Sequence, residues 1–163
     1  GYVPMSAVLV SDEIANYLID EGGEFYHGFT YSGPPVSAAV ALANLALIED
    51  EGLIEHVRDV TAPYLAKKIK ELDSHPLVGE TRSFGLLACV ELVKHKSGPV
   101  LFDPADEVGV KCRDHAINIG LMVRAVRDGM ILSPPLSFQK RDIDITLERL
   151  KSALDATYSE LLK

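Results

Sequence analysis

The stretch GFTYSGPPVSAAVALANLALIEDEGL (residues 28–53) opens on a turn rich in glycine and hydroxyl groups and continues as an alanine-rich helix. Thr30, Tyr31 and Ser32 offer hydroxyl groups and backbone N–H groups just before the helix begins. Unpaired N–H groups and the helix dipole favour an anion at such a place. The turn is therefore a candidate phosphate site.

A purely structural role explains the same turn. Either Thr30 or Ser32 would cap the helix, while Pro34 and Pro35 fix its first turn. The pattern predicts the helix itself over about residues 36–51. Apolar residues spread around most of its circumference, which is typical of a helix that must be buried.

The other periodicities predict alternating helices and short strands. Before the turn we expect a strand at residues 6–10 and a helix at 12–20. The elements expected after it are a helix at 53–72 kinked or divided by Pro63, two strands within 77–95, a helix at 106–119, a hairpin around Asp128-Gly129 and a helix at about 140–162. This order predicts an α+β layer of helices on a small, mostly antiparallel sheet.

Composition narrows the class of function. The chain has 163 residues, is 47% hydrophobic and carries a formal net charge of −8, which argues against nucleic acid or an anionic membrane as partner. No apolar run is long enough to span a bilayer and no signal peptide is recognisable, so we expect a cytoplasmic protein that acts on small molecules. Cys89 and Cys112 lack the spacing of metal ligands, so we expect packed thiols and no metal.

Four blocks occur in the order and spacing of a known family. They are GYVPMSAVLVSDEI, FYHGFTYSGPPVSAAVALANLALIEDEGL, VGETRSFGLLACVELV and GLMVRAVRDGMILSPPLSFQKRDID. Together they resemble the C-terminal portion of class III aminotransferases, the pyridoxal 5′-phosphate (PLP) enzymes that include the ω-amino acid:pyruvate transaminases. The resemblance implies a fold-type I PLP-dependent transferase, with mixed α/β and α+β parts. Residues 1–50 would be the end of its large PLP-binding domain with a connecting helix, and residues 51–163 its small C-terminal α+β domain.

The resemblance places the central chemistry outside this chain. The family's lysine, which forms a Schiff base with PLP, lies a few residues before the GYVP block and therefore upstream of Gly1. We expect a fragment with no catalytic residue, inactive by itself, from an enzyme that moves an amino group from an amine or ω-amino acid to a keto acid such as pyruvate. Its first 50 residues would expose apolar surface without partners, so self-association or capture by another chain is expected.

The resemblance also assigns roles to residues that the chain contains. Thr30, with neighbouring Tyr31 and Ser32, would bind the phosphate of PLP held mainly by the other subunit, which makes a homodimer obligatory for activity. Arg124 would bind the carboxylate of the substrate through two parallel hydrogen bonds. Tyr2 would lie near the mouth of the active site.

Each of these positions has a simpler explanation from the residues alone. Arg124 is equally typical of a paired strand arginine that reaches solvent, and Arg127 beside the turn is typical of a solvated rim charge. Tyr2 would pack locally, and His27 would either line the site or form a structural hydrogen bond.

The sequence departs from the family at two places. It has Pro34 where the family usually has histidine, and Ser83 where the family usually has glycine. Neither departure removes Thr30 or Arg124. Two other functions remain as alternatives: a non-catalytic α+β interaction or regulatory module, and a related PLP aminomutase.

Overall fold

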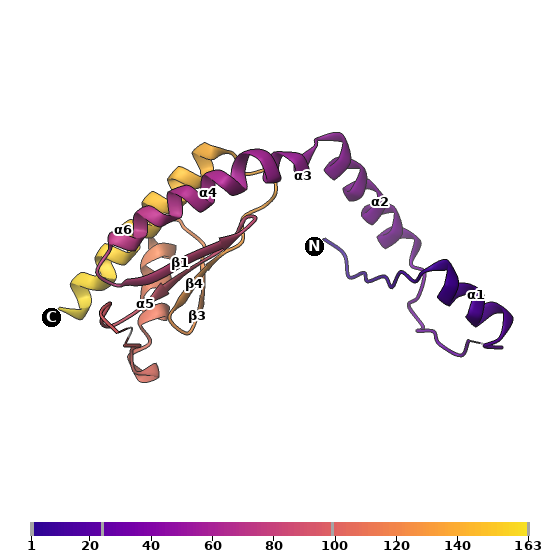
Figure 1. Cartoon of the computed structure of the whole chain (residues 1–163), viewed down its shortest axis with the longest axis horizontal. Helices are drawn as coiled ribbons and strands as arrows, with labels where there is room; N and C mark the ends of the chain where they lie inside the picture. Colours follow the sequence, from indigo (N-terminus) through magenta and orange to yellow (C-terminus); the bar gives the residue numbers. More distant parts are fainter. Residues whose placement is uncertain (1, 24, 99, 163) are drawn as a thin grey trace. The chain divides into compact units, whose positions relative to one another are not determined.

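The chain divides into two compact units, and a computed structural model describes residues 2–23, 25–98 and 100–162 of it (Figure 1). Unit 1 is Gly1–Glu51 and unit 2 is Gly52–Lys163. We describe each unit by itself. No helix in the described residues is both long and apolar enough to cross a membrane.

Unit 1 consists of two helices and the segments that connect them. Helix α1 spans Asp12–Asp20 and begins where Ser11 Oγ accepts a hydrogen bond from the N–H of Ile14 (3.4 Å). Helix α2 spans Pro35–Asp50. Both predicted helices are confirmed to within one residue at each end. No residue of unit 1 that the structure describes is buried.

The predicted strand at residues 6–10 is wrong. These residues form no strand, and the described part of unit 1 contains no other strand. A β-strand exists only where a neighbouring strand accepts and donates its backbone hydrogen bonds. The apolar, β-branched composition of the segment is therefore insufficient without a partner.

Unit 2 begins with an irregular run of helix. Its parts are α3 (Leu53–His56), the π-helical turn η1 (Val57–Thr61), α4 (Ala62–Lys68) and the 3-10 segment η2 (Ile69–Ser74). The predicted interruption near Pro63 is confirmed. The N–H of Ala62 donates to Val57 O, five residues back, immediately before the proline that lacks an N–H group.

A four-stranded antiparallel sheet forms the centre of unit 2. Its strands are β1 (Val78–Phe84), β2 (Leu87–Leu92), β3 (Arg124–Val126) and β4 (Gly129–Leu132), in the spatial order β1-β2-β4-β3. The predicted small antiparallel sheet and its C-terminal hairpin are confirmed. Unit 2 is thus an α+β layer of helices on an antiparallel sheet. Its mixture of helices and strands agrees with the expected fold class.

The hairpin turn lies one residue earlier than predicted. Val126 pairs with Gly129, so the loop consists of Arg127 and Asp128, while Gly129 belongs to β4. Arg127 adopts the left-handed conformation (φ 52°) that the sequence pattern would assign to glycine. The expected Asp128-Gly129 turn is corrected accordingly.

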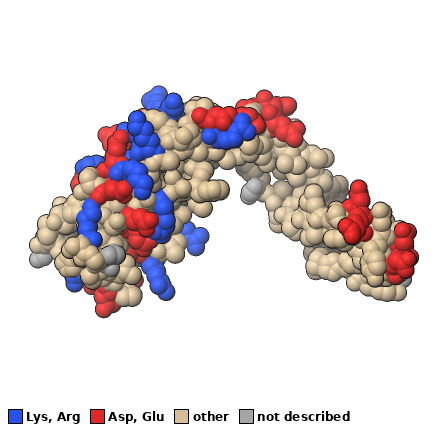
Figure 2. All heavy atoms as spheres, in the orientation of Figure 1, with Lys and Arg blue, Asp and Glu red and all other residues tan. Residues whose placement is uncertain are grey.

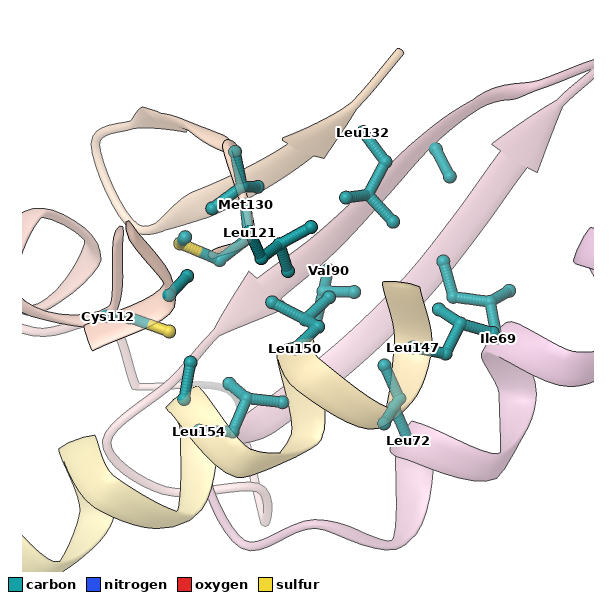
Figure 3. Close-up of a cluster of buried hydrophobic side chains, with 14 of the residues drawn as sticks. Ile69, Leu72, Val90, Cys112, Leu121, Met130, Leu132, Leu147, Leu150 and Leu154 are labelled. Carbon is teal, nitrogen blue, oxygen red and sulfur yellow. The ribbon is translucent and has the colours of Figure 1, made fainter. Parts of the chain in front are cut away.

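Three helices cover one face of the sheet. Helices α4 and α6 (Lys140–Leu161) run side by side over it, and α5 (Val108–Asn118), preceded by the short turn η3 (Pro104–Asp106), packs against α6 (Figure 1). Figure 3 shows side chains of η2, α5 and α6, among them Ile69, Cys112 and Leu150, converging with those of the sheet on a single core. The largest fully buried apolar side chains are Ile69, Val78, Val90, Leu92, Val93, Val108, Met130, Ile143, Leu150 and Leu154.

The charged residues are distributed unequally between the units. Unit 1 has eight Asp and Glu residues and no Lys or Arg, so the chain's net charge of −8 belongs to unit 1. Unit 2 has 16 acidic and 16 basic residues and is formally neutral. In Figure 2 the blue spheres of Lys and Arg accordingly gather over the sheet and helices of unit 2.

Candidate active site

The hydroxyl-rich turn of unit 1 is closed by two hydrogen bonds. The N–H of Ser32 donates to Phe29 O (2.9 Å), and Ser32 Oγ accepts from the N–H of Phe29 (3.1 Å). Thr30 and Tyr31 lie at the tip of this turn and are exposed. Gly33 follows with a left-handed backbone (φ 69°), which directs the chain into α2.

The turn does not cap helix α2. The N-cap residue is Pro34, and no side chain makes a cap hydrogen bond there. Ser32 Oγ instead accepts the N–H of Phe29, within the turn itself. Of the two structural explanations, capping by Thr30 or Ser32 is therefore wrong, whereas Pro35 does occupy the first helical turn as expected.

The groups of this turn fit a phosphate, but only as hydrogen-bond donors. The Thr30 and Tyr31 hydroxyls are exposed at its tip, and no hydrogen bond to the Thr30 hydroxyl occurs among the described residues. Unit 1 contains no lysine or arginine to balance an anion's charge. A phosphate bound here would need its counter-charge from outside unit 1.

Arg124 lies on the sheet face opposite the helices. Residues that oppose each other in an antiparallel ladder point to the same face, and the ladder places Arg82, Cys89, Ile131 and Arg124 in one row across all four strands. In the next strand positions, Ala88, Val90 and Met130 point to the other face and are buried under the helices.

The two arginines of this row differ in their partners. Arg82 donates to Glu80 Oε2 (3.0 Å) and Glu91 Oε2 (2.8 Å), so two carboxylates compensate its charge. Arg124 is exposed, and its guanidinium has no hydrogen bond or ion pair among the described residues. The expectation of a paired strand arginine thus describes Arg82, and the unpaired guanidinium is that of Arg124.

Arg124 lines a pocket of about 410 Å³ at the β3 edge of the sheet. The other walls are mostly apolar and come from the segment before β3, from β4, from α4 and α6, and from the loop between β4 and α6. They comprise Leu65, Leu121, Met122, Val123, Ile131, Leu132, Ser133, Pro134, Pro135, Phe138, Ile143 and Thr146. A single cation beside apolar walls can hold one carboxylate whose remaining part is apolar.

The pocket loop is held in place from a distant part of the sequence. His56 Nε2 donates to Phe138 O (2.9 Å), and the N–H of Phe138 donates to Pro135 O (3.1 Å). No motif in the sequence singles out His56, because its partner is a backbone carbonyl 82 residues away. The histidine fixes the wall of the pocket that faces Arg124's strand.

Comparison with known proteins identifies the family. The family model described as aminotransferase class-III matches residues 1–154. The chain belongs to the class III aminotransferase family. The resemblance found in the four sequence blocks is thereby confirmed.

Individual class III aminotransferases are similar over nearly the whole chain. The putrescine–pyruvate aminotransferase of Pseudomonas aeruginosa is 49% identical over 162 residues, which are 99% of this chain and 35% of that protein. A solved transaminase from directed evolution by ancestral reconstruction is 37% identical with a TM-score of 0.91, covering 98% of this chain and 36% of the other. An (S)-enantioselective ω-transaminase of Thermomicrobium roseum is 38% identical with a TM-score of 0.85, covering 91% and 33%.

These comparisons establish the fold and the extent of the match. The neighbours are fold-type I PLP transaminases, as expected. The chain spans about a third of the length of the class III aminotransferases that it matches. Most of such an enzyme therefore has no counterpart in these 163 residues.

The remaining candidate residues are distributed over both units. Tyr2 is 94% exposed in unit 1, and Gly1, before which the family's lysine is expected, lies outside the described residues. The His27 ring lies between Phe25 and Phe29, with centroid distances of 5.6 and 5.2 Å. Thr30, Tyr31, Ser32 and Tyr2 thus belong to unit 1 and Arg124 to unit 2, each placed within its own unit only.

Neither cysteine forms a disulfide. Cys112 is buried, and burial raises the pKa of its thiol to about 11. Cys89 is half-buried, and burial raises its pKa as well, although Arg82 opposes the shift. The expectation of packed thiols fits both residues. Within the described part of the chain, no three His, Cys, Asp or Glu side chains are grouped as metal ligands.

Proposed function

We propose that this chain is the C-terminal part of a PLP-dependent transaminase that transfers an amino group from an amine or ω-amino acid to a keto acid such as pyruvate. The observation that carries the proposal is the unpaired guanidinium of Arg124 at the edge of an apolar pocket. The 49% identity to a protein named putrescine–pyruvate aminotransferase supports both the amine donor and the keto-acid acceptor.

Arg124 would recognise the carboxylate. Two parallel N–H···O bonds from a guanidinium match the geometry of a carboxylate, and their strength rises where apolar walls exclude water. Met122, Ile131 and Phe138 supply such walls beside Arg124. A substrate without a carboxylate would gain only the apolar contacts. The same pocket can therefore accept an amine in one half-reaction and a keto acid in the other.

The turn at Thr30 would contribute to the cofactor site. When bound, PLP supplies an electron-withdrawing ring through which amino groups are exchanged. The Thr30 hydroxyl and the backbone N–H groups at the turn would donate hydrogen bonds to its phosphate. Since unit 1 lacks cations, we expect the phosphate to be bound mainly by groups outside this chain, with the turn completing the site.

The arrangement of the whole enzyme follows from this division. Residues 1–50 would be the end of the large PLP-binding domain and residues 51–163 the small domain. The turn at Thr30 would complete the site of a second copy, which makes a homodimer the active form. The enzyme would be cytoplasmic. The chain by itself would be inactive, because the Schiff-base lysine would lie upstream of Gly1.

The first experiment replaces the arginine in the full-length polypeptide that contains this sequence. Arg124→Met should raise the KM for pyruvate by about 10- to 100-fold, because a charge-assisted hydrogen-bonded pair is lost. The rate with a carboxylate-free amine should change less than about threefold. Arg141→Met is the control, since Arg141 is an exposed arginine in α6 that does not line this pocket. Equal effects of both variants on pyruvate would contradict the assignment.

A further inference from the structure

Asp128, in the loop between β3 and β4, connects three elements of unit 2. Its Oδ1 accepts a hydrogen bond from the N–H of Gly109 in the first turn of α5 (3.0 Å). Its backbone carbonyl accepts from the N–H of Leu92 at the end of β2 (2.9 Å). The loop is thus bonded to a helix on one side and to a neighbouring strand on the other.

The loop and helix α5 are also in direct steric contact. A Cβ atom placed on Gly109 would lie 2.0 Å from Arg127 O, so no other residue fits there without moving the loop. Arg127 keeps a left-handed backbone (φ 52°), a conformation that L-residues with side chains rarely adopt. The contacts of the loop hold it in this uncommon conformation.

The carboxylate of Asp128 also supplies what the start of α5 lacks. The N-cap residue of α5 is Glu107, which has a left-handed backbone (φ 49°) and makes no side-chain cap hydrogen bond. An N-terminal helical turn carries unpaired N–H groups and a partial positive charge, which a carboxylate stabilises. Asp128 therefore caps a helix from another element.

The anchored loop is one of the contacts that set the position of Arg124. Arg124 begins β3, a strand of three residues that pairs with β4 on one side only. Among the described residues, no group forms a hydrogen bond or ion pair with the guanidinium of Arg124 and so orients it. The backbone of β3 is fixed by the ladder to β4, by Val123 and Ala125, which pack against the core, and by the anchored loop at Arg127 and Asp128.

We propose that Asp128 is a positioning residue for Arg124: its hydrogen bond to Gly109 anchors the hairpin to α5 and so holds the guanidinium where it meets the carboxylate of the substrate. This inference rests on the proposed carboxylate-binding role of Arg124. Asp128 itself does not line the pocket and touches no reacting atom. Its effect is therefore expected on carboxylate substrates selectively.

The experiment compares two amino donors in the full-length, PLP-loaded polypeptide. Single-turnover reactions with L-alanine, which has a carboxylate, and with putrescine, which has none, give kcat/KM for each donor. A general loss of active enzyme lowers both values equally and leaves their ratio unchanged. Asp128→Ala should lower the alanine-to-putrescine ratio of kcat/KM about fivefold, the size expected from loss of one helix-cap contact. Asp128→Asn keeps an acceptor oxygen, so its drop should be about twofold.

Two further variants separate positioning from general destabilisation. Asp103→Ala removes a carboxylate that likewise accepts a backbone N–H in a helical turn, that of Ala105 (2.9 Å), and should leave the ratio unchanged. In an Arg124→Met background, Asp128→Ala should have no further effect on the ratio, because the group that it positions is gone.

The outcomes distinguish the two proposals. If Arg124→Met lowers the ratio and neither Asp128 variant does, the positioning role is overturned while the function of Arg124 stands. If Arg124→Met leaves the ratio unchanged, the carboxylate role fails, and the inference about Asp128 fails with it. If Asp128→Ala does not fold, an unchanged ratio in Asp128→Asn overturns the positioning role.

Discussion

Helices α2 and α6 show why apolar content alone does not make a core. Helix α2 is the more apolar, yet its three leucines, Leu42, Leu45 and Leu47, are all more than half exposed. Helix α6 has more polar residues, but most of its apolar ones lie on a single stripe that is buried in the core of unit 2. An apolar stripe is buried by contact with one surface, whereas a helix that is apolar all round needs contacts on every side to be buried.

The same contrast extends to charge. Unit 2 balances its 16 acidic residues with 16 basic ones, several of which form ion pairs across its surface. Unit 1 has eight acidic residues and no basic residue. Exposed apolar side chains and unbalanced charge together distinguish unit 1 from unit 2, which has a buried core and balanced charge.

The largest expected effect tests this contrast with two leucines. Leu150 in α6 is 0% exposed and Leu42 in α2 is 68% exposed. Leu150→Ala should lower the free energy of unfolding of unit 2 by about 3 kcal/mol, through lost burial and a cavity. Leu42→Ala should change it by less than about 0.5 kcal/mol. Urea unfolding of the chain followed by circular dichroism measures both, and similar losses for the two would break the comparison.

A smaller effect is expected from the helix caps. Asp142 accepts the N–H of Gln139 (2.9 Å) in the capping box of α6, and Ser11 accepts the N–H of Ile14 (3.4 Å) at α1. Asp142→Ala should destabilise unit 2 by about 1 kcal/mol. Ser11→Ala should leave the unfolding transition of unit 2 in place and only speed amide hydrogen exchange in α1. A shift of the main transition by Ser11→Ala would show that the two units unfold together.

The smallest expected effect is a pH dependence confined to unit 2. His75 is buried, and its Nδ1 accepts the N–H of Leu77 (3.2 Å), while Nε2 lies 3.3 Å from Asp155 Oδ1. Burial lowers the pKa of His75, with Lys151 and Lys96 adding to the shift and Asp155 opposing it. Protonation of Nδ1 would also break the bond to Leu77.

The direction of the pH effect follows from this lowered pKa. The unfolded chain, in which histidine has a pKa of about 6.5, binds a proton that the folded chain does not. Stability is thus complete above that pH and falls as the pH drops through it towards the lower folded value. Denaturation midpoints between pH 7.5 and 5 measure the slope. His75→Asn should flatten it, and an unchanged slope in that variant would assign the effect to another group.

The elements predicted correctly are those whose signal is local. Helix α6 is defined by a stripe of apolar residues, and α2 begins at adjacent prolines, so both are found within one residue. The strand at residues 6–10 failed because a strand depends on a neighbour that its own residues cannot specify. The hairpin was displaced by one residue because contacts with α5 hold Arg127, and not glycine, in the left-handed conformation.

The residues of the candidate site could be predicted from the sequence, but whether their charges are paired could not. The family blocks single out Thr30 and Arg124, whereas Arg82, in a polar stretch of sequence, occupies the same row of the sheet as Arg124. Only the ladder reveals that Glu80 and Glu91 compensate one of them and leave the other unpaired. The roles of Thr30 and Arg124 stay predictions until the variants are measured.

The π-helical turn at Val57–Thr61 determines how the side chains after it are directed relative to those before it. Each residue of an α-helix advances by about 100°, so the extra residue of a π turn rotates everything after it by about that angle relative to everything before it. His56, before the turn, thereby reaches the carbonyl of Phe138, while Leu65 and Ile69, after it, face the core. Removing one residue from the turn would restore a regular α-helix. Either His56 would then lose the carbonyl of Phe138, or Leu65 and Ile69 would turn away from the core. A single inserted residue thus lets one helical segment serve both the pocket wall and the hydrophobic core.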